Sequence, residues 1–198
     1  MPPTRSFLLV VIAVLACASA SAQGTIPPAE QQIAAAVLPL PADMRDGALV
    51  MGYKEAGKLV TLREGKNSMI CLALYVSRPD FHVACYHKSL EPFMARGRAL
   101  RAQGAKGEAV DSVRFAEIKR GKLRMPAQGT LYTITTKKEN YDAATNRVKD
   151  YRPLTVVYMP GATPESVGIS AQPVPNGPWL MFPGTPKAHI MMTGSMTP

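Results

Sequence analysis

Two cysteines, Cys71 and Cys85, constrain the fold of this chain more than any other feature of its sequence. Residues 69–76 and 81–87 have the β-branched and aromatic composition of two strands, with a Ser-Arg-Pro-Asp turn between them. When these strands pair about the turn, Cys71 falls opposite Cys85, within reach of a disulfide bond. The bond would fix the register of the hairpin and close a loop of about 15 residues.

The first 22 residues predict a secretory signal peptide. One basic residue, Arg5, precedes an apolar run at 7–18, and an Ala-Ser-Ala tripeptide fits cleavage before Gln23. The apolar run is shorter than the roughly 20 residues that span a bilayer. A lipoprotein-type sequence ending at Cys17 is the alternative, and it would anchor the chain to a membrane. We favour ordinary cleavage, which delivers the domain to an oxidising compartment, periplasmic or external, where the disulfide can form.

A nucleophilic role for Cys85 is the competing interpretation, with His82 or His87 as its base. On a strand His87 shares a face with Cys85, whereas His82 lies on the other face. No cysteine-enzyme signature surrounds either cysteine, so we prefer the structural disulfide.

The remaining segments predict an α+β domain over residues 23–192, with a short tail at 193–198. Helices are expected at 30–37, 89–103 and 108–120, and further strands at 48–53, 58–63, 130–136, 154–159, 179–182 and 188–192. Ser89 should cap the second helix, and Gly104 and Gly121 should end the second and third. We read the polar stretch 137–152 as an exposed loop. The fold predicted is an antiparallel sheet of hairpins with the two central helices packed on one face.

Charge is concentrated in those two helices. Between residues 94 and 124 nine basic side chains stand against three acidic ones, whereas residues 153–198 carry only Glu165 and Lys187. In an exported protein such a basic region fits an anionic lipid or a cell-wall polymer better than a nucleic acid. The candidate contacts are Arg96, Arg98, Arg101, Lys119 and Arg120. The alternative is that the charges only maintain solubility.

Catalytic and metal-binding signals are weak. The sequence has no GxGxxG, P-loop, GxSxG, HExxH or CxxCH motif, so we expect no cofactor and lean against an enzyme. The best candidate constellation is His87, His189 and Glu91, in a pocket between the second hairpin and the closing one. His189 with Met191 is a further candidate for a soft metal ion, although core packing explains the methionines equally well.

Two sequence blocks resemble a group of secreted bacterial proteins without an assigned activity. The first is Leu-Arg-Glu-Gly-Lys-Asn at 62–67, followed by Cys71; the second is Gly-Pro-Trp-Leu-Met at 177–181, followed by Pro-Gly-Thr-Pro-Lys-Ala-His-Ile-Met at 183–191. The resemblance implies a bacterial exported domain in which Cys71 and the closing hairpin belong together, and it assigns no site. The sequence thus favours a non-catalytic envelope or secreted binding module, with a small enzyme or metal-binding protein as the alternative.

Overall fold

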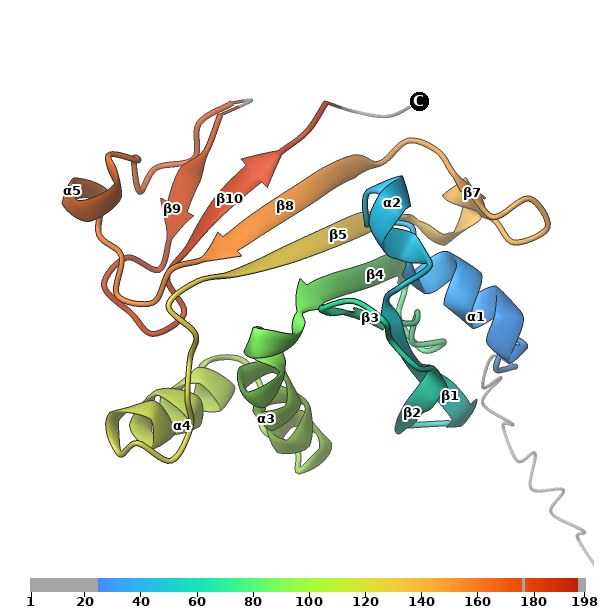
Figure 1. The fold of residues 1–198 in the computed structure, drawn as a ribbon, viewed down its shortest axis with the longest axis horizontal. Helices are drawn as coiled ribbons and strands as arrows, with labels where there is room; N and C mark the ends of the chain where they lie inside the picture. The colour runs from blue at the N-terminus through green and yellow to red at the C-terminus, as the bar shows by residue number, and fades with distance from the viewer. Residues whose placement is uncertain (1–24, 176, 196–198) are drawn as a thin grey trace, which may run out of the picture.

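The computed structural model describes residues 25–175 and 177–195, and these form a mixed α+β fold built on one large sheet (Figure 1). The strands are β1 (Leu49–Glu55), β2 (Lys58–Arg63), β3 (Met69–Leu72), β4 (Asp80–His87), β5 (Gly129–Lys137), β8 (Arg152–Tyr158), β9 (Trp179–Met181) and β10 (His189–Thr193). Their spatial order is β2-β1-β3-β4-β5-β8-β10-β9. The helices are α1 (Ala29–Ala36), α2 (Ala42–Arg45), α3 (Glu91–Ala102), α4 (Glu108–Lys119) and α5 (Pro164–Val167). The predicted fold class is therefore confirmed, whereas the predicted signal at 1–22 lies outside the described residues.

One strand pair departs from the predicted row of antiparallel hairpins. β3 pairs with β1 in parallel, and all other neighbours in the sheet are antiparallel. After β2 the chain crosses back past the start of β1, where a Cβ on Gly65 would lie 2.8 Å from the Leu49 nitrogen. Glycine lets the two backbones approach this closely, and β3 can then join the free side of β1.

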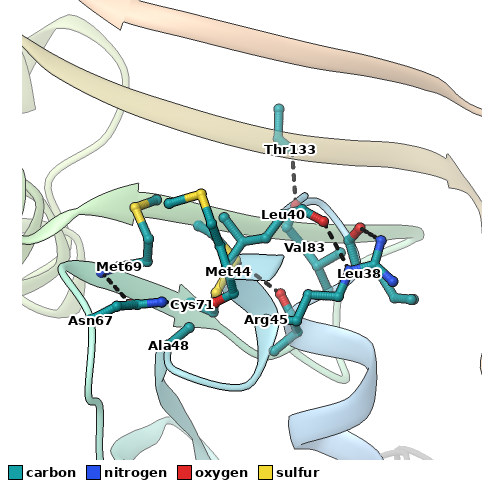
Figure 2. The surroundings of a disulfide bond; sticks show 12 residues. Leu38, Leu40, Met44, Arg45, Ala48, Asn67, Met69, Cys71, Val83 and Thr133 are labelled. Carbon is teal, nitrogen blue, oxygen red and sulfur yellow. Dashed lines mark hydrogen bonds between the residues drawn. A yellow bond between two sulfur atoms is a disulfide. The ribbon is translucent and has the colours of Figure 1, made fainter. Parts of the chain in front are cut away.

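The disulfide predicted from the hairpin register is present. Cys71 and Cys85 are register partners with Cα atoms 4.0 Å apart, and both are fully buried. Side chains from the α1–α2 segment cover the bridge, among them Leu40 and Met44 (Figure 2). Arg45 fixes that segment, because its guanidinium donates to the Leu38 and Leu40 carbonyls. We call this covered side of the sheet the α1 face.

Alternate residues of the same strands point to the opposite side, which we call the α3 face. Ile70 and Tyr86 form a core there with Leu90, and Met94 of α3 packs against it. Helix α4 lies beside α3, and Figure 1 shows the pair on the other side of the sheet from α1. The two sheet faces are thus covered by different parts of the chain.

Helix boundaries follow the predicted glycines but not the predicted cap. Gly104 and Gly121 follow α3 and α4 with positive φ values of 93° and 69°. Ser89 does not cap α3, because a 3-10 turn, η1 (Lys88–Leu90), precedes the helix. The cap of η1 is His87, whose ring accepts from the Ser89 backbone N–H.

The strand β3 is shorter than predicted, and one predicted loop is ordered. β3 ends at Leu72 rather than at residue 76: the Ala73 N–H still donates to Met51 of β1, and the chain then turns, with the Arg78 N–H donating to the Tyr75 carbonyl. The stretch 137–152 holds a 3-10 turn, η2 (Lys138–Asn140), and a small hairpin of β6 (Tyr141–Asp142) and β7 (Arg147–Val148). Stacking of Tyr141 on Phe81, with ring centroids 4.5 Å apart, ties this hairpin to the core.

The closing hairpin forms as predicted, with β9 antiparallel to β10. Its core consists of Leu180 and Ala188 with Ala162 from the segment before α5. Cys71 and this hairpin lie in the same sheet, with β4, β5 and β8 between them. Across residues 25–175 and 177–195, no helix combines the length and apolarity needed to cross a bilayer.

Candidate functional site

A groove of about 870 Å³ runs between α3 and the α3 face of the sheet. Strand residues form its floor and one wall, and the last two turns of α3 form the other wall. The lining residues are Tyr53, Gly57, Leu59, Leu72, Ala73, Tyr75, Arg78, His82, Ala84, Arg98, Ala99, Arg101 and Ala102.

The groove opens because side chains become small along α3. At the start of the helix, Leu90 and Met94 fill the space above the sheet. One helical turn further on, Ala99 and Ala102 occupy this side of the helix, and Ala84 lies below them on β4. The small side chains of these alanines leave a space that Leu90 and Met94 fill at the start of the helix.

Two tyrosines form the end of the groove away from the core. The rings of Tyr53 and Tyr75 pack with centroids 5.2 Å apart and planes tilted by 47°. Burial raises the pKa of Tyr53, and the neighbouring Tyr75 adds to the effect, so the hydroxyl stays protonated. The end wall therefore offers aromatic surface with hydroxyl groups at its edge, an arrangement suited to amphipathic ligands.

Three arginines reach the groove, and two of them are neutralised by carboxylates. Arg78 binds Asp80 through two hydrogen bonds of 2.8 and 3.0 Å. Arg98 donates to Glu91 at 2.6 Å and to the Tyr86 hydroxyl at 2.9 Å. Arg101 is exposed and has no carboxylate partner among the described residues. The groove therefore carries one uncompensated positive charge.

The base of α3 is fixed by the network that holds Arg98. Tyr86 donates a short hydrogen bond to Glu91, whose other oxygen accepts from Arg98. Burial and the hydrogen bond to Glu91 hold the pKa of Tyr86 well above its usual range. Tyr86 is therefore a neutral donor that orients the Glu91–Arg98 pair and is not a base for catalysis.

Arg101 also lies close to a second arginine. A Cβ on Gly97 would be 3.1 Å from Nη1 of Arg101 and 3.0 Å from Nη1 of Arg114 on α4. The Arg114 side chain is only 7% exposed, and its Nε is buried without a hydrogen-bond partner in the described part of the chain. Its counter-ion, Asp111, is shared with Lys187. Two cations thus share the Asp111 carboxylate, and the Arg101 guanidinium lies near one of them, Arg114.

The Asp111 cluster joins α4 to the closing hairpin. Arg114 lies over the Phe93 ring at 3.6 Å, and Lys187 lies over the Phe182 ring at 3.5 Å. Burial raises the pKa of Asp111, but hydrogen bonds from Lys187 and Arg114 outweigh it and leave a net lowering. The carboxylate is therefore ionised and holds both cations.

Aromatic rings continue from this cluster to His189 on β10. Tyr158 lies between Phe93 and His189, with centroid distances of 6.4 and 5.0 Å. His189 donates from Nδ1 to the Lys187 carbonyl at 2.7 Å, and Phe182 packs on its ring. Burial lowers the pKa of His189; the hydrogen bond to the Lys187 carbonyl opposes this, the Lys187 charge adds to it, and the net effect is a lowering. His189 is thus a neutral packing residue in this cluster.

The five residues predicted to contact an anionic surface do not form one patch. Arg96 binds Glu117, with hydrogen bonds of 2.6 to 3.0 Å, and Arg98 binds Glu91. Arg101 lies in the groove near the end of α3, whereas Lys119 and Arg120 lie at the end of α4. Residues 103–107 join the end of α3 to the start of α4, so Lys119 and Arg120 lie at the end of α4 that is remote from this connection.

The catalytic and metal candidates are also separated. His87 lies on β4 and bonds to Ser89, Glu91 bonds to Arg98, and His189 lies on β10 beyond β5 and β8. Three strand spacings amount to roughly 14 Å, so the predicted constellation does not converge. Within residues 25–175 and 177–195, no group of three His, Cys, Asp or Glu side chains has metal-binding geometry. Met191 is half-buried on the same strand as His189.

A second depression, of about 800 Å³, lies beyond His82 at the ends of β4 and β5. Its lining is polar and includes Asp80, Glu139 and Asp150, with Lys137 bridging to Glu139 at 4.0 Å. It has none of the aliphatic floor of the α3 groove. We therefore regard the groove as the candidate site.

The sequence predicts Arg98 and Arg101 as binding residues but does not predict the rest of the groove. Tyr53 and Tyr75 lie on segments whose adjacency depends on the parallel β1–β3 pairing, which the sequence pattern does not reveal. The run of small residues at 99 and 102 beside two arginines was the available signal. The side chains on this face of the helix are too small to fill a core, and charged residues lie beside them.

Comparisons with protein families, with curated proteins and with solved structures find no match for this chain. The chemistry of the groove is therefore the basis for the function.

Proposed function

We propose that this protein is an exported, non-catalytic binding module whose groove takes an acidic, partly apolar molecule. The observation that carries the proposal is the unpaired Arg101 beside an alanine-, leucine- and tyrosine-lined floor. The acid group would bind near Arg101, where an anion offsets the excess of positive charge. The apolar body would lie along Leu72 and Ala84 and reach the tyrosine pair. The buried disulfide is consistent with export.

Two sources could supply this chemistry in an envelope: a free organic acid, or an anionic lipid in a membrane. The aliphatic floor favours both over a fully hydrated cell-wall polymer, which would leave that floor in contact with water. Binding of the acid free in solution would indicate the first source, and binding to vesicles of phosphatidylglycerol would indicate the second. Phosphatidylcholine vesicles serve as the uncharged reference.

The test uses 8-anilino-1-naphthalenesulfonate, an aromatic acid whose fluorescence reports binding, at pH 8. Arg101→Glu should weaken binding about tenfold, because it replaces an attraction with a repulsion at a partly desolvated site. Lys119→Glu changes the net charge equally at an exposed position of α4 and should change the affinity less than twofold. Equal effects of the two variants would show that only net charge matters and would exclude the groove.

A second pair of variants tests the apolar part without changing charge. Ala99→Leu should fill the groove and abolish binding. The variant should still fold, because position 99 is exposed and leucine is a good helix former. Ala116→Leu makes the same change on the exposed side of α4 and should leave binding intact. Retained binding in Ala99→Leu would place the ligand elsewhere.

A further inference from the structure

We propose that His82 couples ligand binding in the groove to pH, so that an acidic ligand binds more tightly as the pH falls from 8 to 5. This inference rests on the function proposed above. His82 lines the groove from β4, two residues from Ala84 on the same face. A charge that appears on its imidazole therefore appears on the floor of the site.

The hydrogen bonds of His82 accommodate both of its protonation states. Its Nδ1 lies 2.8 Å from the Thr135 hydroxyl, which can either donate to the neutral ring or accept from the protonated one. The neighbouring Thr133 hydroxyl donates to the Val83 carbonyl at 3.0 Å. Protonation thus costs no hydrogen bond with β5, and the geometry allows the ring to change charge in place.

The new charge would have no free counter-ion among the side chains that the structure describes. Charged and titratable side chains surround His82 from several elements. Near the start of β4 these are Arg78 and Asp80, and on β8 Arg152 is the register partner of Thr135. The groove adds Arg98 and Arg101 from α3 and the end-wall tyrosines Tyr53 and Tyr75. Asp80 is the one carboxylate in this set, and both of its oxygens are held by Arg78. Protonation therefore raises the uncompensated charge that lines the groove from one to two.

In the free protein this second charge is disfavoured. Burial lowers the pKa of His82, and the Arg78 charge adds to the lowering, although Asp80 partly opposes it. A bound acid supplies the missing counter-ion and raises the pKa again, so binding takes up a proton. Reciprocity then requires that a lower pH strengthens binding of the acid.

The experiment measures the affinity for 8-anilino-1-naphthalenesulfonate between pH 8 and pH 5, where the sulfonate stays ionised and only protein groups titrate. A new charge pair at a partly exposed site is worth up to about a fivefold change in affinity, equivalent to a rise of about 0.7 in the pKa of His82 on binding. We expect binding to become tighter as the pH falls to 5, by up to about fivefold, the full gain being reached only below the pKa of His82 in the free protein. His82→Asn should remove this change, so that the affinity of the variant is the same at pH 5 and at pH 8.

His87→Asn is the matched control, because His87 lies on the same strand outside the groove lining, and its pH response should equal that of the wild type. Should His82→Asn fold poorly, an NMR titration of the wild-type imidazoles gives the same answer, since the pKa of His82 must rise when the probe is added. A pH-independent affinity, or an unchanged His82 pKa, would overturn the inference. If no Arg101-dependent binding occurs at pH 8, the proposed function itself fails, and the two failures are thus distinct.

Discussion

The strongest structural prediction concerns Asp111, the carboxylate shared by Arg114 and Lys187. Asp111→Asn keeps the size of the side chain but leaves two cations facing each other with side-chain exposures of only 7% and 19%. Breaking a fully buried ion pair costs about 3–5 kcal/mol. Because Asp111 and Lys187 keep some contact with water, we expect about 2 kcal/mol, below that range.

Urea unfolding followed by circular dichroism measures this loss. With a slope of about 2 kcal/mol/M for a domain of this size, the midpoint should fall by about 1 M. The stabilisation by the Asp111 carboxylate is fully present above the pKa of an aspartate in the unfolded chain, about 3.9. It is lost as the pH falls through the lower pKa that Asp111 has in the folded protein. The difference between the wild type and the variant should therefore shrink as the pH falls below about 3.9, and it should vanish only below the lowered folded-state pKa of Asp111.

Glu117→Gln is the matched control, since it removes a carboxylate between the same two helices whose partner, Arg96, is 31% exposed and can turn toward water. Its midpoint should shift much less than that of Asp111→Asn. A shift of under about 0.2 M urea for Asp111→Asn, or equal shifts for the two variants, would refute the assignment of Asp111 as the link between α4 and the closing hairpin.

Three further predictions concern stability. Replacing both Cys71 and Cys85 by alanine should cost about 3 kcal/mol, the value for a loop of about 15 residues, measured by urea unfolding against the oxidised wild type; a loss below 1 kcal/mol would contradict it. Gly129→Ala should cost about 1–3 kcal/mol, because its Cβ would lie 2.7 Å from the fully buried Leu90; unchanged stability would show that Leu90 can move. The neutral, buried His189 should make the protein less stable as the pH falls from 7 to 5, because the unfolded chain takes up a proton that the folded state resists; His189→Asn should flatten this slope, and an unaltered slope would argue against it.

Local patterns in the sequence predicted most of the helices and strands and the disulfide, because each depends on neighbouring residues. The period of two along β4 placed Cys85 opposite Cys71, and the glycines at 104 and 121 marked the ends of α3 and α4. The predicted N-cap of α3, Ser89, was wrong. The ring of His87 accepts from the Ser89 N–H and caps a 3-10 turn that precedes the helix.

The candidate site could be predicted only in part, because it depends on contacts between distant segments. The parallel pairing of β3 with β1 brings Tyr53 and Tyr75 together, and no local pattern specifies that strand order. The pairing of Arg96 with Glu117, 21 residues apart, likewise removes a charge that composition alone assigns to a basic surface. Arg101 has no carboxylate partner within residues 25–175 and 177–195 for the same reason, since the tertiary structure brings none of their carboxylates beside it.

The most direct test of the central claim is to locate the bound acid by NMR. Titration of the ¹⁵N-labelled protein with 8-anilino-1-naphthalenesulfonate at pH 8 should shift the backbone amide signals of Tyr75, Ala84 and Ala99, which line the groove on three different elements of the chain. The signal of Lys119, at the end of α4, should stay in place. Shifts gathered around Lys119, or spread evenly over the surface, would contradict the assignment of the groove as the binding site.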